Sequence, residues 1–440
     1  MYGGIATAGA DQILYAQHDG DLFLIDVESG DLLDLQTPHP FCPAKIELSA
    51  CAVAPDGSYL LADSLHHRVR RLDAQGGPLG LIGRAPVAGM RQEDETGVIA
   101  DPVALLPVDD GVVTVSGGED QEHAVQRFDF DGTQRATFAH PTGGFFRAHG
   151  IARVGEEIWI AETVGGAIRR FAGDGTFLGD TKLHVELQRP FRLVADEYGG
   201  VLLLLAPESE EEQDVSGVAR IAPDGSFEGW IVPGGEEPGH VHLPFDIAVL
   251  PDGRFVVADL PLGTPPDVRL QLFAADGSLK RVLVSDRMAL EVLKDAWRES
   301  YAGAQAETAE EMLALARLEH FFRGTDPEAA ERAALLYRAA TAMDPADSRP
   351  RAGLGDLLQH GAGRPLEAIH EFEEAIAAGA PEADFRARIA ECRHAAGDLD
   401  GAIALLGTLL DEEDLPEEAP RLLDELGSWF LQRAGEDPRA

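Results

Sequence analysis

Asp-Gly pairs recur along the first two thirds of the chain, and each one lies between short runs of apolar residues. The pairs begin at Asp19, Asp56, Asp110, Asp131, Asp174, Asp224, Asp252 and Asp276. An Asp-Gly pair between alternating apolar runs is a strong signal for a tight hairpin, because the favoured turn needs positive φ at both central residues. The sequence therefore predicts a succession of antiparallel hairpins over this region.

The hairpins repeat as a unit of four strands. Residues 52–83 contain one unit in full, with an Asp-Gly turn after the first strand, a polar loop after the second and a Gly-rich turn after the third. Aligned on their turns, the units begin near Gly4, Cys51, Val103, Ile151, Leu193 and Ile247. A repeat of about 40–50 residues with four strands indicates the blade of a β-propeller. We therefore predict a six-bladed β-propeller over residues 1–286.

Two of these units resemble NHL repeats. Residues 53–73 read VAPDGSYLLADSLHHRVRRLD, and the positions that match the family pattern are Asp63, Ser64, His67 and Arg68. His66 stands where the family has Asn, and this chain contains no Asn. Residues 238–260 resemble the segment that leads into a blade of the family. The other four units end their second strand differently, so the resemblance implies the fold more firmly than it implies any functional residue.

Beyond Asp286 the apolar residues recur with a period near 3.6, which predicts helices. Small residues recur about every 34 residues and are followed four positions later by a larger one; the pairs are Ala333 and Tyr337, Ala368 and Phe372, and Ala402 and Leu406. This pattern resembles a tetratricopeptide array. We predict a connecting helix in 287–308 and tetratricopeptide-like repeats in 309–440, closed by a capping helix over 421–433.

The charge of the chain narrows the class of partner. There are 36 Lys and Arg against 77 Asp and Glu, a formal charge of −41. Such a surface repels phosphate, so neither nucleic acid nor an anionic membrane is an expected partner. Cys42, Cys51 and Cys392 lack metal-ligand spacing, and neither a signal peptide nor an apolar membrane span is visible, which together favour a cytoplasmic protein. The oligomeric state stays open.

The channel of the propeller is the first candidate site. The residues just before the first apolar core positions of the inner strands are Gly4, Ala50, Pro102, Gly150, Arg192 and Asp246. A catalytic site here would have to combine Asp101, His149, Arg192 and Asp246, either as a hydrolase or as a lyase with Ca or Zn in the channel. Zinc needs three converging ligands, and the channel offers one histidine. We therefore expect a structural ring and no metal or other cofactor.

The concave side of the helical repeats is the second candidate site. In the tetratricopeptide family the first helix of each pair lines a groove that holds a peptide. By register, the predicted groove positions are Arg349, Asp356, Gln359, His360, Asp384, Glu391 and His394. Family members that clamp acidic C-terminal peptides carry Lys and Asn at such places, whereas this chain has Ala, Asp and Glu. The resemblance therefore implies a basic or amphipathic peptide.

Both modules resemble binding repeats, and no nucleophile with an adjacent base or phosphate-binding loop is visible. We therefore expect a non-catalytic scaffold whose propeller face and helical groove bind protein or peptide partners. The alternative is a metal-dependent propeller hydrolase or lyase with its site in the central channel.

Overall fold

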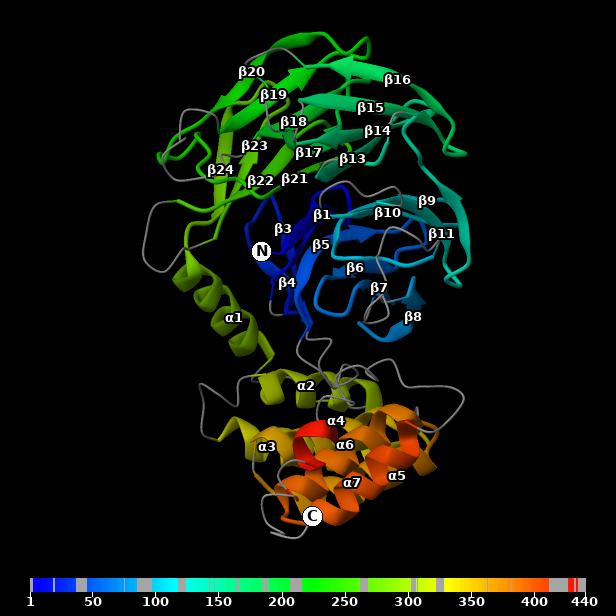
Figure 1. Ribbon diagram of the computed structural model, residues 1–440. Helices are drawn as coiled ribbons and strands as arrows, with labels where there is room; N and C mark the ends of the chain where they lie inside the picture. The colour runs from blue at the N-terminus through cyan, green and yellow to red at the C-terminus, as the bar shows by residue number, and fades with distance from the viewer. Residues whose placement is uncertain are drawn as a thin grey trace. The chain divides into compact units, whose positions relative to one another are not determined.

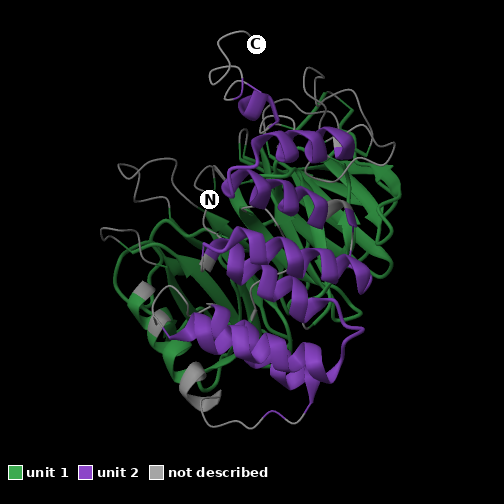
Figure 2. Cartoon of the chain, turned by 90° about the horizontal axis from the view of Figure 1, so that it is seen from below, with its two compact units in different colours: residues 1–38, 46–297 green, residues 39–45, 298–440 purple. Residues whose placement is uncertain are grey.

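A computed structural model describes the following residues: 3–18, 20–36, 46–74, 76–84, 97–117, 124–141, 143–145, 147–163, 166–183, 187, 190–205, 216–261, 268–301, 306, 308–321, 328–361, 363–380, 382–410, 426–430 and 433. At positions 287, 291, 297–301, 318, 321, 361, 383, 384 and 410 the description covers the backbone alone. The chain divides into two compact units, residues 1–38 with 46–297 and residues 39–45 with 298–440 (Figure 2).

The first unit is a six-bladed β-propeller, which confirms the predicted fold (Figure 1). Each blade is an antiparallel sheet of four consecutive strands. The strands are β1 Gly4–Thr7, β2 Gln12–Ala16, β3 Leu22–Asp26 and β4 Leu32–Gln36 in blade 1; β5 Leu48–Val53, β6 Tyr59–Asp63, β7 Arg68–Leu72 and β8 Pro78–Ile82 in blade 2; β9 Pro102–Val108, β10 Gly111–Ser116, β11 Val125–Asp129 and β12 Gln134–Thr137 in blade 3. They continue as β13 Ala148–Val154, β14 Glu157–Glu162, β15 Ala167–Ala172 and β16 Phe177–Lys182 in blade 4; β17 Pro190–Ala195, β18 Val201–Leu205, β19 Gly217–Ile221 and β20 Phe227–Pro233 in blade 5; β21 Asp246–Val249, β22 Phe255–Asp259, β23 Arg269–Phe273 and β24 Leu279–Val284 in blade 6. The first strands contact one another in order, and β21 contacts β1, so the ring is closed.

Most of the Asp-Gly pairs lie in hairpin turns, as the sequence predicts, but the turn has positive φ at the glycine alone, because no described aspartate of these pairs has positive φ. Positive φ values between 84° and 90° occur at Gly57, Gly132, Gly175, Gly225, Gly253 and Gly277. The aspartate also stabilises the turn, since a carboxylate oxygen of Asp56 accepts a hydrogen bond from the amide of Ser58 at 3.0 Å. The pair that contains Gly111 differs, because Gly111 opens β10, where a Cβ would overlap the carbonyl oxygen of Phe128. Asp19 lies outside the described residues.

Blades 2, 4 and 6 each bury an acid at the end of the second strand against an arginine of the third. The pairs are Asp63 with Arg70 at 2.6 Å, Glu162 with Arg169 at 2.6 Å and Asp259 with Arg269 at 2.9 Å. Asp63 also accepts hydrogen bonds from the amide and the ring of His66. Burial raises the pKa of Asp63, but the His66 hydrogen bond and the charges of Arg70 and Arg68 outweigh it and hold the pKa at about 2. In blade 2, Asp63 of the NHL-like segment therefore connects the loop after β6, through His66, to Arg70 of β7.

Blades 1 and 6 share no strand, because each sheet is built from consecutive strands. Polar contacts join them instead: the Ile5 amide donates to Asp246 (2.8 Å), the Thr7 hydroxyl to the carbonyl oxygen of Val249 (2.7 Å), and Arg254 pairs with Asp11 (2.5 Å) and with Glu28. Closure of the ring therefore depends on side chains as well as on apolar packing.

Helix α1 (Arg287–Tyr301) follows blade 6 and packs back against blade 1. Lys294 is buried, with its ammonium group 3.8 Å from the carboxylate of Asp21 and 5.3 Å from the ring centre of Phe23. A buried lysine is costly unless it is paired, so this contact anchors the helix specifically.

The second unit is helical. Its elements are α2 Ala309–Phe321, α3 Ala329–Met343, α4 Arg349–Asp356, the π-helix η6 Leu357–Gly361, α5 Pro365–Ala377, α6 Glu382–Ala395 and α7 Leu399–Leu410. The repeated positions of the sequence pattern are fully buried: Ala333, Tyr337, Ala368, Phe372, Ala402 and Leu406. Gly353 and Gly355 lie so close to the Tyr337 and Phe372 rings that an added Cβ would overlap them.

The predicted capping helix is described over residues 426–430, which are helical, while residues 421–425 lie outside the described part. Trp429 in this segment is buried. Across the described residues, no helix combines the length and apolarity needed to cross a membrane.

The inner strands approach one another closely at Gly4, near the axis of the propeller. A Cβ at this position would lie 2.9 Å from the Cα of Ala50 and 2.9 Å from a carboxylate oxygen of Asp246. We expect Gly4→Ala to destabilise the propeller by about 2 kcal/mol, as overpacking of a tight site does. Gly173→Ala is the matched control, since no described atom lies within 4 Å of its added Cβ. Equal unfolding midpoints of the two variants in denaturant would contradict this packing.

Candidate functional site

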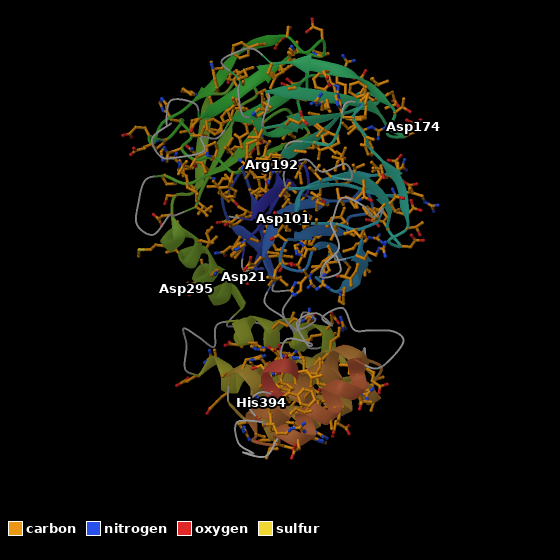
Figure 3. The ribbon with its side chains drawn as sticks, in the orientation of Figure 1. Asp21, Asp101, Asp174, Arg192, Asp295 and His394 are labelled. Atoms are coloured by element: carbon orange, nitrogen blue, oxygen red, sulfur yellow. The ribbon has the colours of Figure 1, made fainter. Side chains whose placement is uncertain are left out.

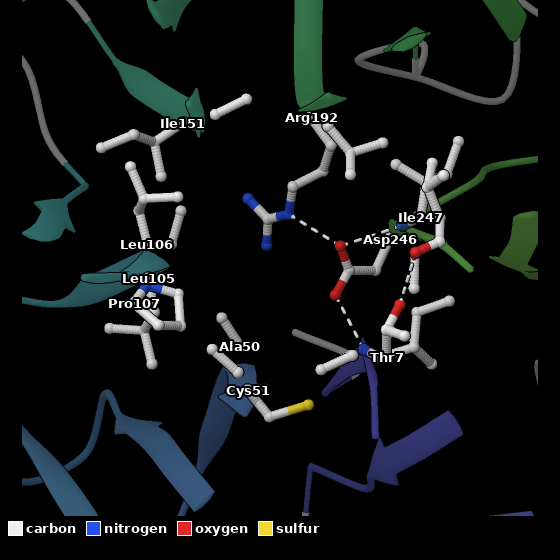
Figure 4. A pocket seen from close by; sticks show the side chains of 18 of the residues that line it. Thr7, Ala50, Cys51, Leu105, Leu106, Pro107, Ile151, Arg192, Asp246 and Ile247 are labelled. Carbon is white, nitrogen blue, oxygen red and sulfur yellow. Dashed lines mark hydrogen bonds and ion pairs between the residues drawn. The ribbon is translucent and has the colours of Figure 1, made fainter. Parts of the chain in front are cut away.

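Arg192 lies at the axis of the propeller, where the inner strands begin. Its Nη1 donates to the carbonyl oxygen of His149 at 2.6 Å, and its Nη2 donates to the carbonyl oxygen of Ser49 at 3.4 Å. Its Nε lies 3.4 Å from a carboxylate oxygen of Asp246 (Figure 4). Arg192 and Asp246 are 8% and 7% exposed, so this ion pair is buried. One side chain of blade 5 thus bonds to blades 2, 4 and 6.

Asp246 and Ser49 extend these contacts to the remaining blades. The carboxylate of Asp246 accepts hydrogen bonds from the amides of Ile5 in blade 1 and Ile247, at 2.8 and 3.0 Å. The hydroxyl of Ser49 donates to the carbonyl oxygen of Pro102 in blade 3. We call Arg192, Asp246 and Ser49, with the backbone groups of Ile5, Pro102 and His149, the axial cluster. It connects all six blades.

The charges of the axial cluster compensate each other. Burial raises the pKa of Asp246, while the charge of Arg192 and the hydrogen bonds from two amides act in the opposite direction. Burial also lowers the pKa of Arg192, against the attraction of Asp246. A guanidinium group stays protonated in proteins, so we treat the two groups as an ion pair. The polar atoms of Arg192 and Asp246 bind mainly to backbone groups of the propeller. Such bonds are typical of residues with a structural role.

The structure brings only part of the predicted catalytic set together. His149 contributes its carbonyl oxygen to the axial cluster, but its ring stacks on Phe191 with the ring centres 5.1 Å apart. Burial and the charges of Arg192 and Arg147 lower the pKa of His149 to about 4, so the ring is neutral at pH 7. Asp101 precedes β9 with a φ of 45° (Figure 3).

The amide of Asp101 donates to Nδ1 of His67 at 3.0 Å. Burial raises the pKa of the Asp101 carboxyl group. Within the described part of the chain, no three His, Cys, Asp or Glu side chains are grouped closely enough to bind a metal ion. Alignment of the blades places Ser49 at the channel, level with Asp101 and His149, but predicts no role for it, because a serine that bonds only to backbone carbonyls leaves no side-chain motif.

A cavity of about 320 Å³ extends from the axial cluster along the channel. All six inner strands line it, mostly with Ala, Val, Leu, Ile and Pro. The charged residues among them are Arg153, Arg192 and Asp246. The repeat pattern of the sequence identifies the ring where the inner strands begin, but it does not predict this apolar space behind the ring.

The predicted groove of the helical unit contains a buried polar network. Asp356 is 8% exposed and forms an ion pair with Arg388, which is 1% exposed. The rings of His320 and His360 lie 3.3 and 3.8 Å from the Asp356 carboxylate. Burial raises the pKa of Asp356, but Arg388, His320 and His360 together hold it well below its ordinary value. The charge of Asp356 is thus balanced within the unit.

The other predicted groove residues extend this network along the first helices. Gln359 donates to Glu391 at 3.0 Å and accepts from Arg388 at 3.2 Å. Arg349 is paired with Glu310 at 2.6 Å and with Asp347 at 2.8 Å, and His394 stacks on Trp429 with ring centres 4.8 Å apart (Figure 3). The side chain of Asp384 lies outside the described part.

Comparisons with known proteins agree with the helical assignment. The tetratricopeptide repeat family matches residues 359–425, which confirms that prediction. None of the curated proteins matches the chain.

Three solved structures illustrate what the chain is similar to. They are a virginiamycin B lyase from Staphylococcus aureus (14% identity, 64% of this chain and 83% of that one, TM-score 0.45), a gluconolactonase from Xanthomonas campestris (18%, 63% and 86%, TM-score 0.44) and a chain of a nidogen and laminin complex (14%, 62% and 92%, TM-score 0.45).

The axial ion pair predicts an asymmetric response to mutation. Asp246→Ala leaves Arg192 buried without its carboxylate, and we expect it to lower the free energy of unfolding by about 3–5 kcal/mol. The double variant Arg192→Met with Asp246→Ala removes both charges and should recover a substantial part of that loss. Denaturant unfolding of the parent protein, the single variant and the double variant measures these changes in the free energy of unfolding. A single variant within about 0.5 kcal/mol of the parent protein would show that the pair does not hold the ring.

The half-buried ring of His149 predicts a loss of stability in mild acid. The pKa of His149 in the folded protein, about 4, lies below the ordinary value of 6.5, so the unfolded chain binds a proton first as the pH falls. The stabilising contribution is complete above pH 6.5 and is lost towards pH 4, and amounts to about 1–2 kcal/mol between pH 7 and 5. His149→Phe keeps an aromatic ring on Phe191 and should remove this part of the pH dependence.

The control for this experiment is His370→Phe, which changes an exposed histidine of the helical unit. Unfolding curves at pH 7, 6 and 5 should keep the same pH dependence in His370→Phe as in the parent protein. The same slope in His149→Phe as in the parent would contradict the assignment.

Proposed function

We propose that this protein is a non-catalytic interaction scaffold whose helical groove binds a basic or amphipathic peptide. The observation that carries the proposal is the polar network that links the first helices of successive repeats. Gln359 of η6 is hydrogen-bonded to both Arg388 and Glu391 of α6. Side chains held in this way form a pre-organised surface, which lowers the entropy lost when a peptide binds.

The π-helix η6 supports this reading. It continues α4 directly and contains Gln359 and His360. One-turn π-helices are uncommon and are frequently found at functional sites, because the wider turn redirects the side chains that follow. Here the side chain of His360 remains 48% exposed while its ring lies 3.8 Å from Asp356. The ring is thus partly exposed at the groove and oriented by the protein.

The ion pairs of the groove favour a partner that is not acidic. Recognition of an acidic C-terminus requires cations that can bind its carboxylates. Among the arginines of α4 and α6, Arg349 and Arg388 are already bound to carboxylates of their own unit. Arg351 and Arg386 lie within 4 Å of glutamates as well. Glu391 accepts a hydrogen bond from Gln359 and adds a carboxylate to the same surface as Asp356. Carboxylates in this region favour a peptide with lysine or arginine over an acidic one.

The axial cluster supports the non-catalytic part of the proposal. Arg192 and Asp246 bind backbone groups of three other blades, and the ring of His149 stacks on Phe191. Residues committed to holding the ring together are poorly placed to exchange protons with a substrate. The polar ring where the inner strands begin is therefore assigned to structure.

Peptide selection against the full chain tests the proposed groove. We expect selected peptides to be enriched in Lys, Arg and apolar residues, and we expect Glu391→Lys to weaken their binding by about tenfold or more, since it reverses a groove charge. Glu373→Lys makes the same change on an exposed position of α5 and is the control. Fluorescence anisotropy with a labelled selected peptide measures both. Acidic selected peptides, or binding that survives Glu391→Lys unchanged, would overturn the proposal.

A further inference from the structure

The cavity behind the axial cluster has the dimensions of a small ligand. It is lined by four consecutive residues of β17, 192–195, and four of β21, 246–249. At about 3.3 Å per strand residue this lining spans roughly 10 Å, the length of an extended chain of about eight carbons. The volume of about 320 Å³ lies in the range of small-molecule pockets.

The two ends of this cavity differ in chemistry. Most of the wall is aliphatic and includes Leu106 and Ile151, whose side chains Figure 4 shows around the channel. The guanidinium group of Arg192 projects into the same space from one end. A ligand that fits both parts needs an apolar body and one polar head group.

Arg192 retains donors for such a head group. A guanidinium group carries five N–H donors. Its described partners are the carbonyl oxygens of His149 and Ser49, one on each terminal nitrogen, and Asp246 beside Nε. One N–H therefore remains on each terminal nitrogen beyond these contacts. Figure 4 shows both terminal nitrogens on the side of the guanidinium that faces away from Asp246. Two parallel donors match a carboxylate.

The charge of the lining also favours an anion. The lining has two arginines, Arg153 and Arg192, and one carboxylate, Asp246. Arg153 is exposed and lies 3.9 Å from Glu156, so Arg192 is the cation that a buried ligand would meet. The carboxylate of Asp246 accepts hydrogen bonds from the backbone amides of Ile5 and Ile247, and these bonds stabilise its negative charge when no ligand is bound. A carboxylate bound to the outer edge of Arg192 would thus complete the site.

We propose that the channel cavity binds a small aliphatic monocarboxylate, with the carboxylate on the terminal nitrogens of Arg192 and the alkyl chain along the aliphatic wall. Such a site lies in the propeller and is independent of the peptide groove proposed above. A ligand bound there would contact Arg192, a member of the axial cluster that connects the six blades.

Calorimetric titration of the full chain with octanoate, 1-octanol and octylammonium tests the chemistry of the site. We expect one octanoate to bind, about tenfold or more tightly than either of the other two, because only the carboxylate gains charge-assisted hydrogen bonds. Equal affinity for 1-octanol, a preference for octylammonium, or no binding of octanoate would each overturn the proposal.

Two substitutions locate the bound molecule. Leu106→Trp fills the cavity without changing Arg192 and should weaken octanoate binding by about tenfold or more, since ligand and indole compete for the same space. Leu178→Trp, on the outer strand β16 where Leu178 is 49% exposed, should leave the affinity unchanged. Unchanged binding in a folded Leu106→Trp variant would place octanoate elsewhere and contradict the assignment. If that variant does not fold, the order of affinities in the parent protein decides the question.

Discussion

The ion pair between Arg192 and Asp246 determines how the six blades meet at the axis of the propeller. Neighbouring blades pack apolar faces against each other, but only the axial cluster contacts all of them among the described residues. Because blades 1 and 6 share no strand, the ring has no backbone ladder to close it. The amide of Ile5 instead bonds to Asp246, so the first strand of the chain is fastened to the last blade by a side chain. The close approach at Gly4 places those groups within reach.

Both units use a buried carboxylate and guanidinium to hold repeats in register. In the helical unit, Asp356 of α4 is paired with Arg388 of α6, one repeat later. Burying two charges costs several kcal/mol per ion before their attraction is counted, so such pairs add little net stability over an apolar alternative. Leaving one partner without the other is strongly unfavourable. We therefore interpret these pairs as devices that select one arrangement of the repeats, with hydrophobic burial as the main driving force.

The sequence was sufficient to predict the fold because its signals are local and repeated. Each Asp-Gly turn is encoded by neighbouring residues, and the spacing of Ala333, Ala368 and Ala402 indicated the helical repeat in the same way. The site was predictable only in part. Counting along each blade brought Arg192 and Asp246 to the axis, but the hydrogen bonds of Arg192 go largely to backbone carbonyls, which no side-chain motif records. The burial of Asp356 depends on an arginine 32 positions away in the chain, and the fold alone determines that contact.

Native-state hydrogen exchange on the full chain would show how blade 1 is held in the ring. The Ile5 amide donates to the buried Asp246 carboxylate, so we expect it to exchange as slowly as the amides of the inner strands β5, β9, β13 and β17 and to open only when the whole propeller unfolds. Early exchange over β1–β4, while the other blades stay protected, would show that the ring opens between blades 6 and 1 and that the axial cluster does not close it.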